Sequence, residues 1–278
     1  MVIMENGKNA DILIEYIPAF AVWYKLIILY FFQFVIFILA MVFFWWISST
    51  VLIGALVGEF IIIYLGVLPY RHIVINIEKL REKYRKKYGK LAAQYFWFNY
   101  ESYTIPLLSS SLYFPLLLIT YKQPSFQIIN MPTHFITTSL FPISITLPIG
   151  IIIIIIGFLI QYPSGGFSTD IETYLHLLYP EKGRLLTNGL YKYIRHPRYL
   201  GRGFIAIGLG VIANNIIAYF VGIIHFLVFC SLIGPEDNEL SRRFKDEFLN
   251  YKTKVPALIP RYGNWKEFLR FIFIKKKY

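Results

Sequence analysis

The chain has 278 residues, of which 56% are hydrophobic and 16% are charged. A soluble protein of this length needs more polar surface than such a composition supplies, so the composition excludes an ordinary soluble domain and predicts an integral membrane protein. The formal net charge of +12 is compatible with nucleic-acid or membrane binding. The single cysteine, Cys230, lies in an apolar run and excludes both a disulfide and a cysteine-based metal site within the chain.

The predicted elements begin with apolar runs that are long enough to cross a hydrocarbon core, which takes about 20 helical residues. The first run favours a retained span over a cleavable signal peptide. Single spans are predicted at 26–47, 51–68, 104–121 and 135–160. The run 204–233 is too long for one span and has two asparagines near its middle, which indicates two shorter helices joined by a tight turn. We therefore predict an all-α polytopic membrane protein with about six spans, the last two forming a helical hairpin.

Lysine and arginine residues are concentrated in three segments between or after these spans. The segment 70–90 carries eight of them, 161–198 carries five, and the chain from residue 234 onward carries eleven. With six spans and a cytosolic N-terminus, all three segments are cytosolic, and Lys122 alone lies in the loops of the other side. Membrane topology explains the net charge without nucleic acid. We expect both termini in the cytosol, with the chain in the plasma membrane of a prokaryote or the endoplasmic reticulum of a eukaryote.

Two of the basic segments have helical patterns. The loop 70–90 carries an apolar stripe at helical spacing and is predicted to continue the second span as a helix. This stripe comprises Ile73, Ile77, Leu80, Tyr84 and Tyr88. The segment 265–277 has a tryptophan at one end and three lysines at the other, which is typical of a helix in the membrane interface beside anionic headgroups. We divide the chain into a membrane region of about four spans (1–178) and a region with the last two spans and cytosolic helices (179–278).

The candidate functional residues fall in two short clusters at the ends of the predicted hairpin. "GLYKYIRHPRYLG" at 189–201 leads into the fifth span, and "GPEDNEL" at 234–240 leaves the sixth. Because a hairpin returns the chain to the same depth on the same side of the membrane, we expect the clusters to meet. The residues brought together are Arg195, His196, Tyr199, Glu236 and Asp237.

Such a cluster suits a zwitterionic ligand with an apolar or aromatic part. Arg195 or His196 would hold a carboxylate and Glu236 an ammonium by charge-assisted hydrogen bonds. Tyrosine faces would stabilise a neighbouring cation such as a sulfonium. Pro197 lacks a backbone donor and biases the preceding residue away from helix, so we expect the fifth helix to begin there. Gly201 permits close approach of a ligand or a neighbouring helix.

Not every polar residue of the first cluster needs a functional role. Lys192, Tyr193 and Arg198, taken singly, are typical of interfacial anchors at the end of a span. An acidic pair on the side where cations predominate is not typical of anchoring, which favours a functional interpretation of Glu236 and Asp237.

Three ordered elements resemble the membrane methyltransferases grouped around isoprenylcysteine carboxyl methyltransferase and the phospholipid methyltransferases. They are "RLLTNGLYKYIRHPRYLG" at 184–201, "EDNEL" at 236–240 and "FKDEFLNYKTKVPALIP" at 244–260. In that superfamily a "tsGpYryvRHPxYxG" element opens a helical hairpin and an "EExxL" element closes it. The resemblance covers roughly residues 183–262.

This resemblance implies a methyltransferase that uses S-adenosylmethionine at a cytosolic site and takes a lipid-borne or prenyl-type acceptor from the bilayer. It implies no metal. The catalytic residues would be Arg195, His196 and Glu236. The cofactor-binding residues would be Leu185, Leu186, Tyr191, His196, Pro197, Arg198, Tyr199, Gly201, Glu236 and Asp237.

The chain departs from the superfamily pattern at two places. Asp237 replaces the usual second glutamate of the closing element. The prenylcysteine enzymes carry an arginine four residues before that pair, which is thought to engage the substrate carboxylate, and this chain has Leu232 there. The "EEPF" element of the phospholipid enzymes is also absent. The sequence therefore leaves the acceptor open.

Two other functions remain as alternatives. NADPH-dependent sterol-type reductases share the hairpin and carry "RHxNYxGD", whereas here Pro197 precedes Arg198, and Arg202 rather than an aspartate follows Gly201. A non-catalytic membrane scaffold or transport component is the second alternative. Glu59, the acidic residue deep in an early span, is a functional candidate by its position, but the sequence shows no partner for it.

Overall fold

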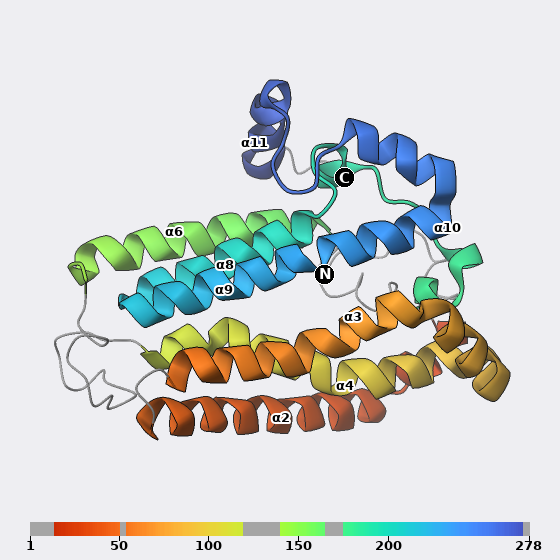
Figure 1. The fold of residues 1–278 in the computed structure, drawn as a ribbon, viewed down its shortest axis with the longest axis horizontal. Helices are drawn as coiled ribbons and strands as arrows, with labels where there is room; N and C mark the ends of the chain where they lie inside the picture. Colours follow the sequence, from red (N-terminus) through yellow and green to blue (C-terminus); the bar gives the residue numbers. More distant parts are fainter. Residues whose placement is uncertain (1–13, 51–53, 119–139, 165–174, 275–278) are drawn as a thin grey trace.

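The computed structural model describes residues 14–50, 54–118, 140–164 and 175–274, and every regular element in this part of the chain is a helix (Figure 1). The α-helices are α2 (Trp23–Thr50), α3 (Gly54–Tyr88), α4 (Ala92–Tyr113), α6 (Ile143–Gln161), α8 (Pro197–Ala213), α9 (Ile216–Ser231), α10 (Ile233–Lys254) and α11 (Trp265–Phe273). Short 3-10 turns are η1 (Pro18–Ala21), η2 (Gly89–Leu91), η3 (Phe114–Leu118), η5 (Tyr162–Ser164), η6 (Pro180–Lys182), η7 (Gly189–Lys192) and η8 (Tyr262–Asn264). The predicted all-α fold is confirmed.

Helices α2 and α6 expose large apolar side chains over much of their surface. Phe31 and Leu39 of α2 and Ile152 and Phe158 of α6 are all more than half exposed. Such surfaces are unstable in water but are what a helix presents to lipid chains. Four helical stretches of the described residues are long and apolar enough to cross a membrane, namely Ile27–Ile47, Leu56–Leu116, Ile143–Ser164 and Ile216–Lys254. The chain is therefore an integral membrane protein.

The number of spans stays a prediction. The stretch Leu56–Leu116 contains both α3 and α4, and α8, with 17 residues, is shorter than a typical span. Two groups of residues used in the predictions lie outside the described residues. They are Lys122, used for the topology, and the lysines at 275–277, used for the interfacial helix.

Helices α6 and α8 approach each other closely at facing glycines. A Cβ atom on Gly157 of α6 would lie 2.7 Å from the carbonyl oxygen of Gly201 in α8, and one on Gly201 would lie 2.8 Å from that of Gly157. Gly150 and Gly208 face each other in the same way about two turns along. Small residues let membrane helices pack with their backbones in contact. Of the two roles expected for Gly201, the structure therefore shows the close approach of a neighbouring helix.

The predicted hairpin of the last two apolar helices is confirmed, and its turn lies where the two asparagines stand. Asn214 takes the left-handed conformation (φ 60°) that ends α8, which asparagine adopts more readily than most residues. Asn215 is the N-cap of α9, and its side-chain oxygen accepts a hydrogen bond from the backbone N–H of Ala218 at 2.9 Å. Helices α8 and α9 therefore run antiparallel and side by side (Figure 1).

The predicted helix in the basic segment 70–90 is also confirmed as a continuation of the second span, because α3 extends to Tyr88. Its apolar stripe is buried in one core with parts of α4 and residues 175–179. Arg85 forms an ion pair with Glu181 at 2.8 Å, which ties this helix to the segment that precedes the candidate site.

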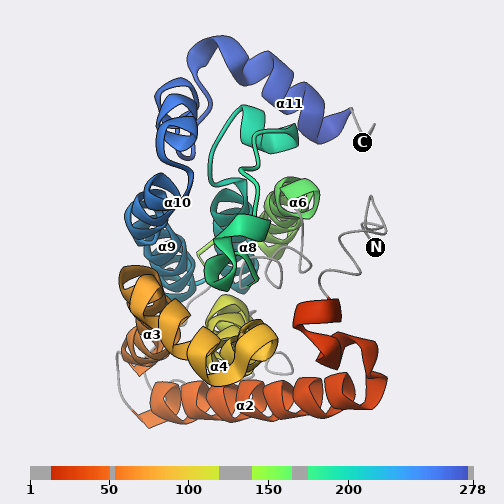
Figure 2. The same ribbon diagram turned by 90° about the vertical axis from the view of Figure 1, so that its right-hand side faces the viewer.

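Helix α11 packs one apolar face on the molecule and exposes another. Phe268 and Ile272 are buried against Leu190, whereas Leu269 and Phe273 are exposed. Viewed along most of the other helices (Figure 2), α10 and α11 lie beyond α8 and α9, on the side away from α3 and α4, and α2 crosses beneath α3 and α4 at an angle. The exposed face of α11 is compatible with the interfacial position expected from its sequence.

Candidate functional site

The hairpin brings the two polar clusters into direct contact, as the sequence predicts. The hydroxyl of Tyr199, in the first turn of α8, donates a hydrogen bond of 2.6 Å to Oε2 of Glu236, in the first turn of α10. The ring of His196 stacks on the ring of Tyr199 with centroids 5.5 Å apart and planes 5° from parallel. The two clusters thus form one surface, made by Tyr199, His196, Glu236 and Asp237, which we call the polar wall. The residues in contact across it are 37 to 41 positions apart in the chain.

His196 lies between two carboxylates. Its Nε2 is 3.0 Å from Oδ1 of Asp237, and its Nδ1 is 3.5 Å from Oε2 of Glu236. Burial disfavours the charged ring, but the hydrogen bonds to Asp237 and Glu236 and their negative charges outweigh it and raise the pKa of His196 to about 9. His196 is therefore a buried cation at neutral pH.

Asp237 organises the part of the wall behind His196. Nη2 of Arg195 lies 2.7 Å from Oδ2 of Asp237, and Nε of Arg195 lies 3.4 Å from Oδ1, so the pair is bidentate. Lys252 is a third cation at this carboxylate, with Nζ 3.3 Å from Oδ2. Arg195 also donates from Nη1 to the carbonyl oxygen of Val255. Each guanidinium nitrogen of Arg195 thus has a protein partner.

Backbone hydrogen bonds fasten the first cluster to the segment after α10. The N–H groups of Arg195 and His196 donate to the carbonyl oxygens of Pro256 and Ala257, each at 2.9 Å. The hydroxyl of Tyr251 donates to the carbonyl oxygen of Tyr191 at 2.6 Å. Pro256 and Ala257, in the third sequence element, therefore hold the first element in place.

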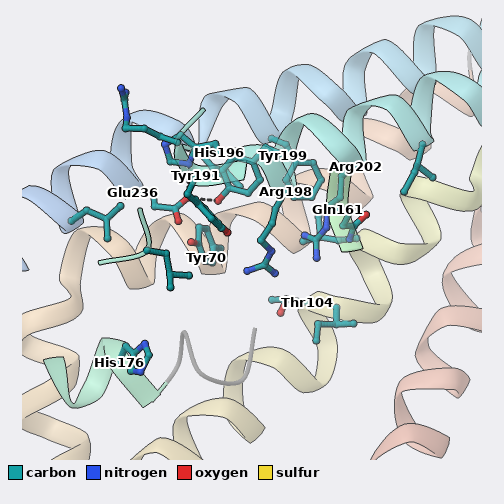
Figure 3. A pocket seen from close by; sticks show the side chains of 18 of the residues that line it. Tyr70, Thr104, Gln161, His176, Tyr191, His196, Arg198, Tyr199, Arg202 and Glu236 are labelled. Carbon is teal, nitrogen blue, oxygen red and sulfur yellow. Dashed lines mark hydrogen bonds and ion pairs between the residues drawn. The ribbon is translucent and has the colours of Figure 1, made fainter. Parts of the chain in front are cut away.

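The polar wall forms one end of a cavity of about 430 Å³. Figure 3 shows Glu236, His196 and Tyr199 on this wall and His176 across the cavity from them. The cavity extends between α4, α6 and α8 through apolar side chains that include Leu108. Seven of the residues predicted to bind a cofactor line it: Leu185, Leu186, Tyr191, His196, Arg198, Tyr199 and Glu236.

The other predicted residues lie around the cavity in different ways. Arg195 is also among the residues that line it. Pro197 is the first residue of α8, as expected for a residue without a backbone donor. Gly201 faces α6, and Asp237 is buried behind His196. These last three are not among the residues that line the cavity.

Several cavity residues were not found by sequence reasoning, because they come from helices outside the recognised motifs. Tyr70 of α3 hydrogen-bonds through its hydroxyl to Tyr199. Thr104 of α4, Gln161 of α6 and Arg202 of α8 also line the cavity (Figure 3). The available signal was one polar side chain at or near the end of an otherwise apolar run in each case.

His176 differs from His196 although both line the cavity. Burial, with smaller contributions from the positive charges of Arg243 and Arg184, lowers the pKa of His176 to about 4. His176 is therefore a neutral hydrogen-bonding group at neutral pH, whereas His196 is a cation.

A second polar cluster lies within the apolar helices. Glu59 of α3, Ser111 of α4 and His225 of α9 are all buried. The hydroxyl of Ser111 donates to Oε1 of Glu59 and lies 2.8 Å from Nδ1 of His225. Among the described residues, Oε2 of Glu59 has no hydrogen-bond partner. Glu59 therefore has partners that the sequence did not reveal, and one of them, His225, lines the cavity.

Within the described ranges, no group of three or more histidine, cysteine or acidic residues is arranged to hold a metal ion. The site consists of the polar wall and a cavity lined by both apolar and charged side chains. Together, fold and site define the class: an all-α integral membrane protein with a polar site at the open end of a helical hairpin.

A family described as "Protein of unknown function (DUF1295)" matches residues 109–255, which is more than half of the chain, so the chain belongs to this family. The chain is 28% identical to protein-S-isoprenylcysteine O-methyltransferase of Schizosaccharomyces pombe (32% of this chain, 39% of the relative) and 30% identical to that of Xenopus laevis (40% of each). It is 36% identical to nickel-cobalt-cadmium resistance protein NccN of Alcaligenes xylosoxydans xylosoxydans (28% of this chain, 36% of the relative).

The matches thus span 36% to 40% of the length of these curated relatives. No solved structure matches the chain. The resemblance to the isoprenylcysteine methyltransferases, first stated from three sequence elements, is confirmed by the relatives that carry this name.

Proposed function

We propose that this protein is an integral membrane methyltransferase that uses S-adenosylmethionine and acts on a prenyl-type or other lipid-borne acceptor. The names of the isoprenylcysteine methyltransferase relatives support the reaction class. The observation that carries the proposal is the contact between Tyr199 and Glu236, because it joins the two motif clusters into one wall of a cavity that continues among apolar side chains. Such a cavity accommodates a polar and an apolar reactant at the same time.

The residues of the wall fit the cofactor. An amino-acid moiety requires an anion for its ammonium and a cation for its carboxylate, and Glu236 and His196 provide these within 3.5 Å of each other. The faces of Tyr191 and Tyr199 suit a sulfonium. Leu185 and Leu186, which also line the cavity, provide apolar surface for the adenine ring.

S-adenosylmethionine, when bound, supplies a methyl group on a positively charged sulfur. Glu236, held by Tyr199 and His196, is the group that binds and orients the amino-acid end. Arg195 and Asp237 keep His196 in place and charged, and we assign them a positioning role. Because methyl transfer is a displacement at carbon, alignment of the reactants and exclusion of water can provide most of the rate enhancement.

The acceptor would enter from the bilayer and the cofactor from the cytosol. The last turns of α3 and the first turns of α8 and α10 lie toward the same end of the molecule (Figure 1), which supports one side of the membrane for the basic residues there, the cytosolic one by the positive-inside rule. Both termini are proposed to be cytosolic as well. The same basic segments would lie beside anionic headgroups. Residues of both proposed regions, 1–178 and 179–278, line the cavity.

The proposal is tested by thermal unfolding of the purified protein in a neutral detergent with S-adenosylmethionine, S-adenosylhomocysteine or NADPH. A ligand of the folded state raises the melting temperature. We expect stabilisation by the two adenosyl compounds and none by NADPH. Stabilisation by NADPH alone would contradict the methyltransferase proposal in favour of a reductase, and stabilisation by none of the three would favour a scaffold.

The residues are tested in the same assay. Glu236→Ala and His196→Ala are each expected to abolish stabilisation by S-adenosylhomocysteine, because each removes one of the two charges that hold the amino-acid moiety. Lys192→Ala, which removes an exposed cation from the same sequence element, is the control and should retain it. If both wall variants keep the ligand-induced shift, the proposed site is wrong.

A further inference from the structure

The buried cluster of Glu59, Ser111 and His225 has no part in the proposed binding of the cofactor, yet it reaches the cavity. Its residues come from α3, α4 and α9, which pack on one another. His225 lines the cavity, whereas Glu59 is fully buried and is not among the lining residues. Ionisable side chains within membrane helices are rare and typically mark pathways for substrates, ions or protons. The cluster is therefore a candidate for a chemical role beside the cavity.

The hydrogen bonds of the cluster have one direction. The hydroxyl of Ser111 donates its single proton to Oε1 of Glu59, so its oxygen accepts from Nδ1 of His225, 2.8 Å away. This balance places the proton of the neutral imidazole on Nδ1 and a lone pair on Nε2. The ring meets Ser111 and Glu59 through the same nitrogen, Nδ1, at 2.8 and 3.9 Å. Nε2 is therefore the nitrogen with which His225 can accept a proton from a group in the cavity.

Glu59 is placed to receive that proton at the other end of the chain of hydrogen bonds. Its Oε1 accepts from Ser111, and its Oε2 is buried with no hydrogen-bond partner among the described residues. Uptake of a proton by the carboxyl group therefore breaks no hydrogen bond at Oε2. If His225 takes a proton at Nε2, its Nδ1 proton can pass to Ser111, and the hydroxyl proton of Ser111 can pass to Glu59.

Phe229 joins this cluster to the polar wall. Its ring centroid lies 5.0 Å from that of His225 and 5.5 Å from that of Tyr199. Phe229 also lines the cavity, one helical turn after His225. His225 thus lies beyond the polar wall, toward the apolar part of the cavity, where the head group of a lipid-borne acceptor would meet the cofactor.

The charged neighbour of His225 is Arg202. Its guanidinium carbon lies 5.2 Å from the ring centroid of Phe229, the ring that His225 also contacts. A proton that stayed on His225 would add a second cation next to Arg202, whereas a proton that passes to Glu59 neutralises a carboxyl group. An ammonium head group would likewise meet the positive charge of Arg202, which favours a neutral head group on the acceptor.

We propose that His225, Ser111 and Glu59 form a proton relay, and that the acceptor is methylated on a hydroxyl or thiol whose proton this relay removes. The acceptor oxygen or sulfur forms a bond to the methyl carbon, and the bond from that carbon to the donor sulfur breaks with its electron pair left on the sulfur. The acceptor proton goes to Nε2 of His225 and along the relay to Glu59. It returns by the same path after the product leaves.

The inference rests on the proposed methyltransferase function and names the class of acceptor. His225 is the catalytic residue, because it touches the reacting group, whereas Ser111 and Glu59 act through it and are positioning residues. A carboxylate acceptor has no proton to lose, so such an acceptor would leave the relay without a function.

Binding is tested with two pairs of probes, farnesol with farnesyl methyl ether and farnesyl thiol with farnesyl methyl sulfide. Dissociation constants are measured by thermal unfolding in neutral detergent with S-adenosylhomocysteine present. We expect the hydroxyl or the thiol to bind about three- to tenfold more tightly than its methylated partner, because only the former donates a hydrogen bond to Nε2 of His225. His225→Phe should lose this preference and keep stabilisation by S-adenosylhomocysteine. The pair with the larger preference identifies the acceptor atom as oxygen or sulfur.

Turnover of the better probe tests the residues behind His225. Loss of a general base typically costs 100-fold or more, so His225→Phe should lower kcat by at least about 100-fold. Glu59→Gln and Ser111→Ala should each lower kcat by at least about tenfold, with KM for S-adenosylmethionine and the preference for the hydrogen-bearing probe unchanged. Ser111→Thr retains the hydroxyl and should retain most of the wild-type kcat. Ser110→Ala is the matched control, because Ser110 is buried in the same helix and its hydroxyl donates to the carbonyl oxygen of Leu107.

Two results would overturn the inference. One is equal binding of the two members of both pairs by wild type. The other is a kcat of Ser111→Ala as high as that of Ser110→Ala. The probe preference of wild type and its loss in His225→Phe decide the matter even if Glu59→Gln fails to fold.

These outcomes are separate from those that test the proposed function. If wild type does not respond to S-adenosylhomocysteine, the methyltransferase proposal fails, whatever the probes do. If wild type responds to S-adenosylhomocysteine but does not distinguish the hydroxyl or thiol from its methylated partner, the cofactor site stands and the proton relay fails.

Discussion

The polar wall and the buried cluster of Glu59, Ser111 and His225 use the same kinds of side chain in opposite ways. In the wall, the carboxylates of Glu236 and Asp237 face cations at short distance, and the histidine carries a charge. In the buried cluster, one carboxylate, one hydroxyl and one imidazole form a chain of hydrogen bonds among apolar helices. The difference shows that the neighbouring side chains, more than residue type, decide how a glutamate–histidine pair is used: Arg195 and Lys252 surround the wall with charge, whereas Ser111 joins the buried pair by hydrogen bonds.

The largest effect should come from removing the carboxylate at the centre of the wall. Asp237→Ala removes the carboxylate that Arg195 and His196 share and leaves His196 with Glu236 alone. Breaking a buried ion pair in this way costs about 3–5 kcal/mol in comparable sites. We expect a large fall in melting temperature and loss of S-adenosylhomocysteine binding. Asp246→Ala removes an exposed carboxylate from the same helix and should change little. Similar melting temperatures for the two variants would show that the charges of the wall are not coupled.

The charge of His196 makes the stability of the wall depend on pH. Its pKa rises from 6.5 to about 9 on folding, so the protonated ring contributes stability that is fully present below pH 6.5 and is lost as the pH rises through 9. The difference in melting temperature between wild type and His196→Asn should therefore shrink between pH 7 and pH 10. His72→Asn, at an exposed histidine, is the control and should show no such trend. A pH-independent difference would mean that His196 is neutral.

A change at Gly201 separates helix packing from cofactor binding. Its Cβ would lie 2.8 Å from a backbone oxygen of α6, so Gly201→Ala forces α6 and α8 apart at a cost of about 1–3 kcal/mol. We expect a lower melting temperature with the S-adenosylhomocysteine-induced shift retained. Gly234→Ala, where an added Cβ meets nothing within 4 Å, serves as the matched control. Loss of ligand binding at unchanged stability would instead place Gly201 in the cofactor site.

The smallest effect is expected in the buried cluster. Ser111→Ala removes the hydroxyl that joins Glu59 to His225, and hydrogen bonds between membrane helices are worth about 1 kcal/mol. The melting temperature should fall slightly, and the response to S-adenosylhomocysteine should stay as in wild type. Ser231→Ala, at an exposed serine that bonds its own helix, provides the comparison. A loss of ligand binding in Ser111→Ala would show that the cluster belongs to the site.

The same comparison explains what the sequence could predict. The hairpin and the meeting of Tyr199 with Glu236 were predictable because paired asparagines interrupt one long apolar run and cations mark one side of the membrane. The partners of Glu59 were not predictable, because they lie on other helices. Ser111 is 52 residues after Glu59, and His225 is a further 114 residues along the chain. Apolar runs predict which segments are helices, but not how each helix is rotated about its axis.

The cavity lining shows the same limit. Residues of the three motifs supplied the polar wall, whereas Tyr70, Thr104 and Gln161 reach the cavity only through the packing of α3, α4 and α6 around α8. That packing depends on backbone contacts such as Gly157 with Gly201, which carry no signal of chemistry in the sequence. In the sequence, Arg202 stands out only as a departure from a reductase motif, whereas the structure places it in the cavity lining.

Methyl transfer itself is the most direct test of the central claim. Wild-type protein in lipid vesicles is incubated with methyl-labelled S-adenosylmethionine and a native lipid and prenyl-peptide extract, beside Glu236→Gln and the control Lys192→Gln. The account predicts label in an organic-soluble product with wild type and Lys192→Gln, and none with Glu236→Gln. No transfer by wild type to any fraction of the extract, or undiminished transfer by Glu236→Gln, would contradict it.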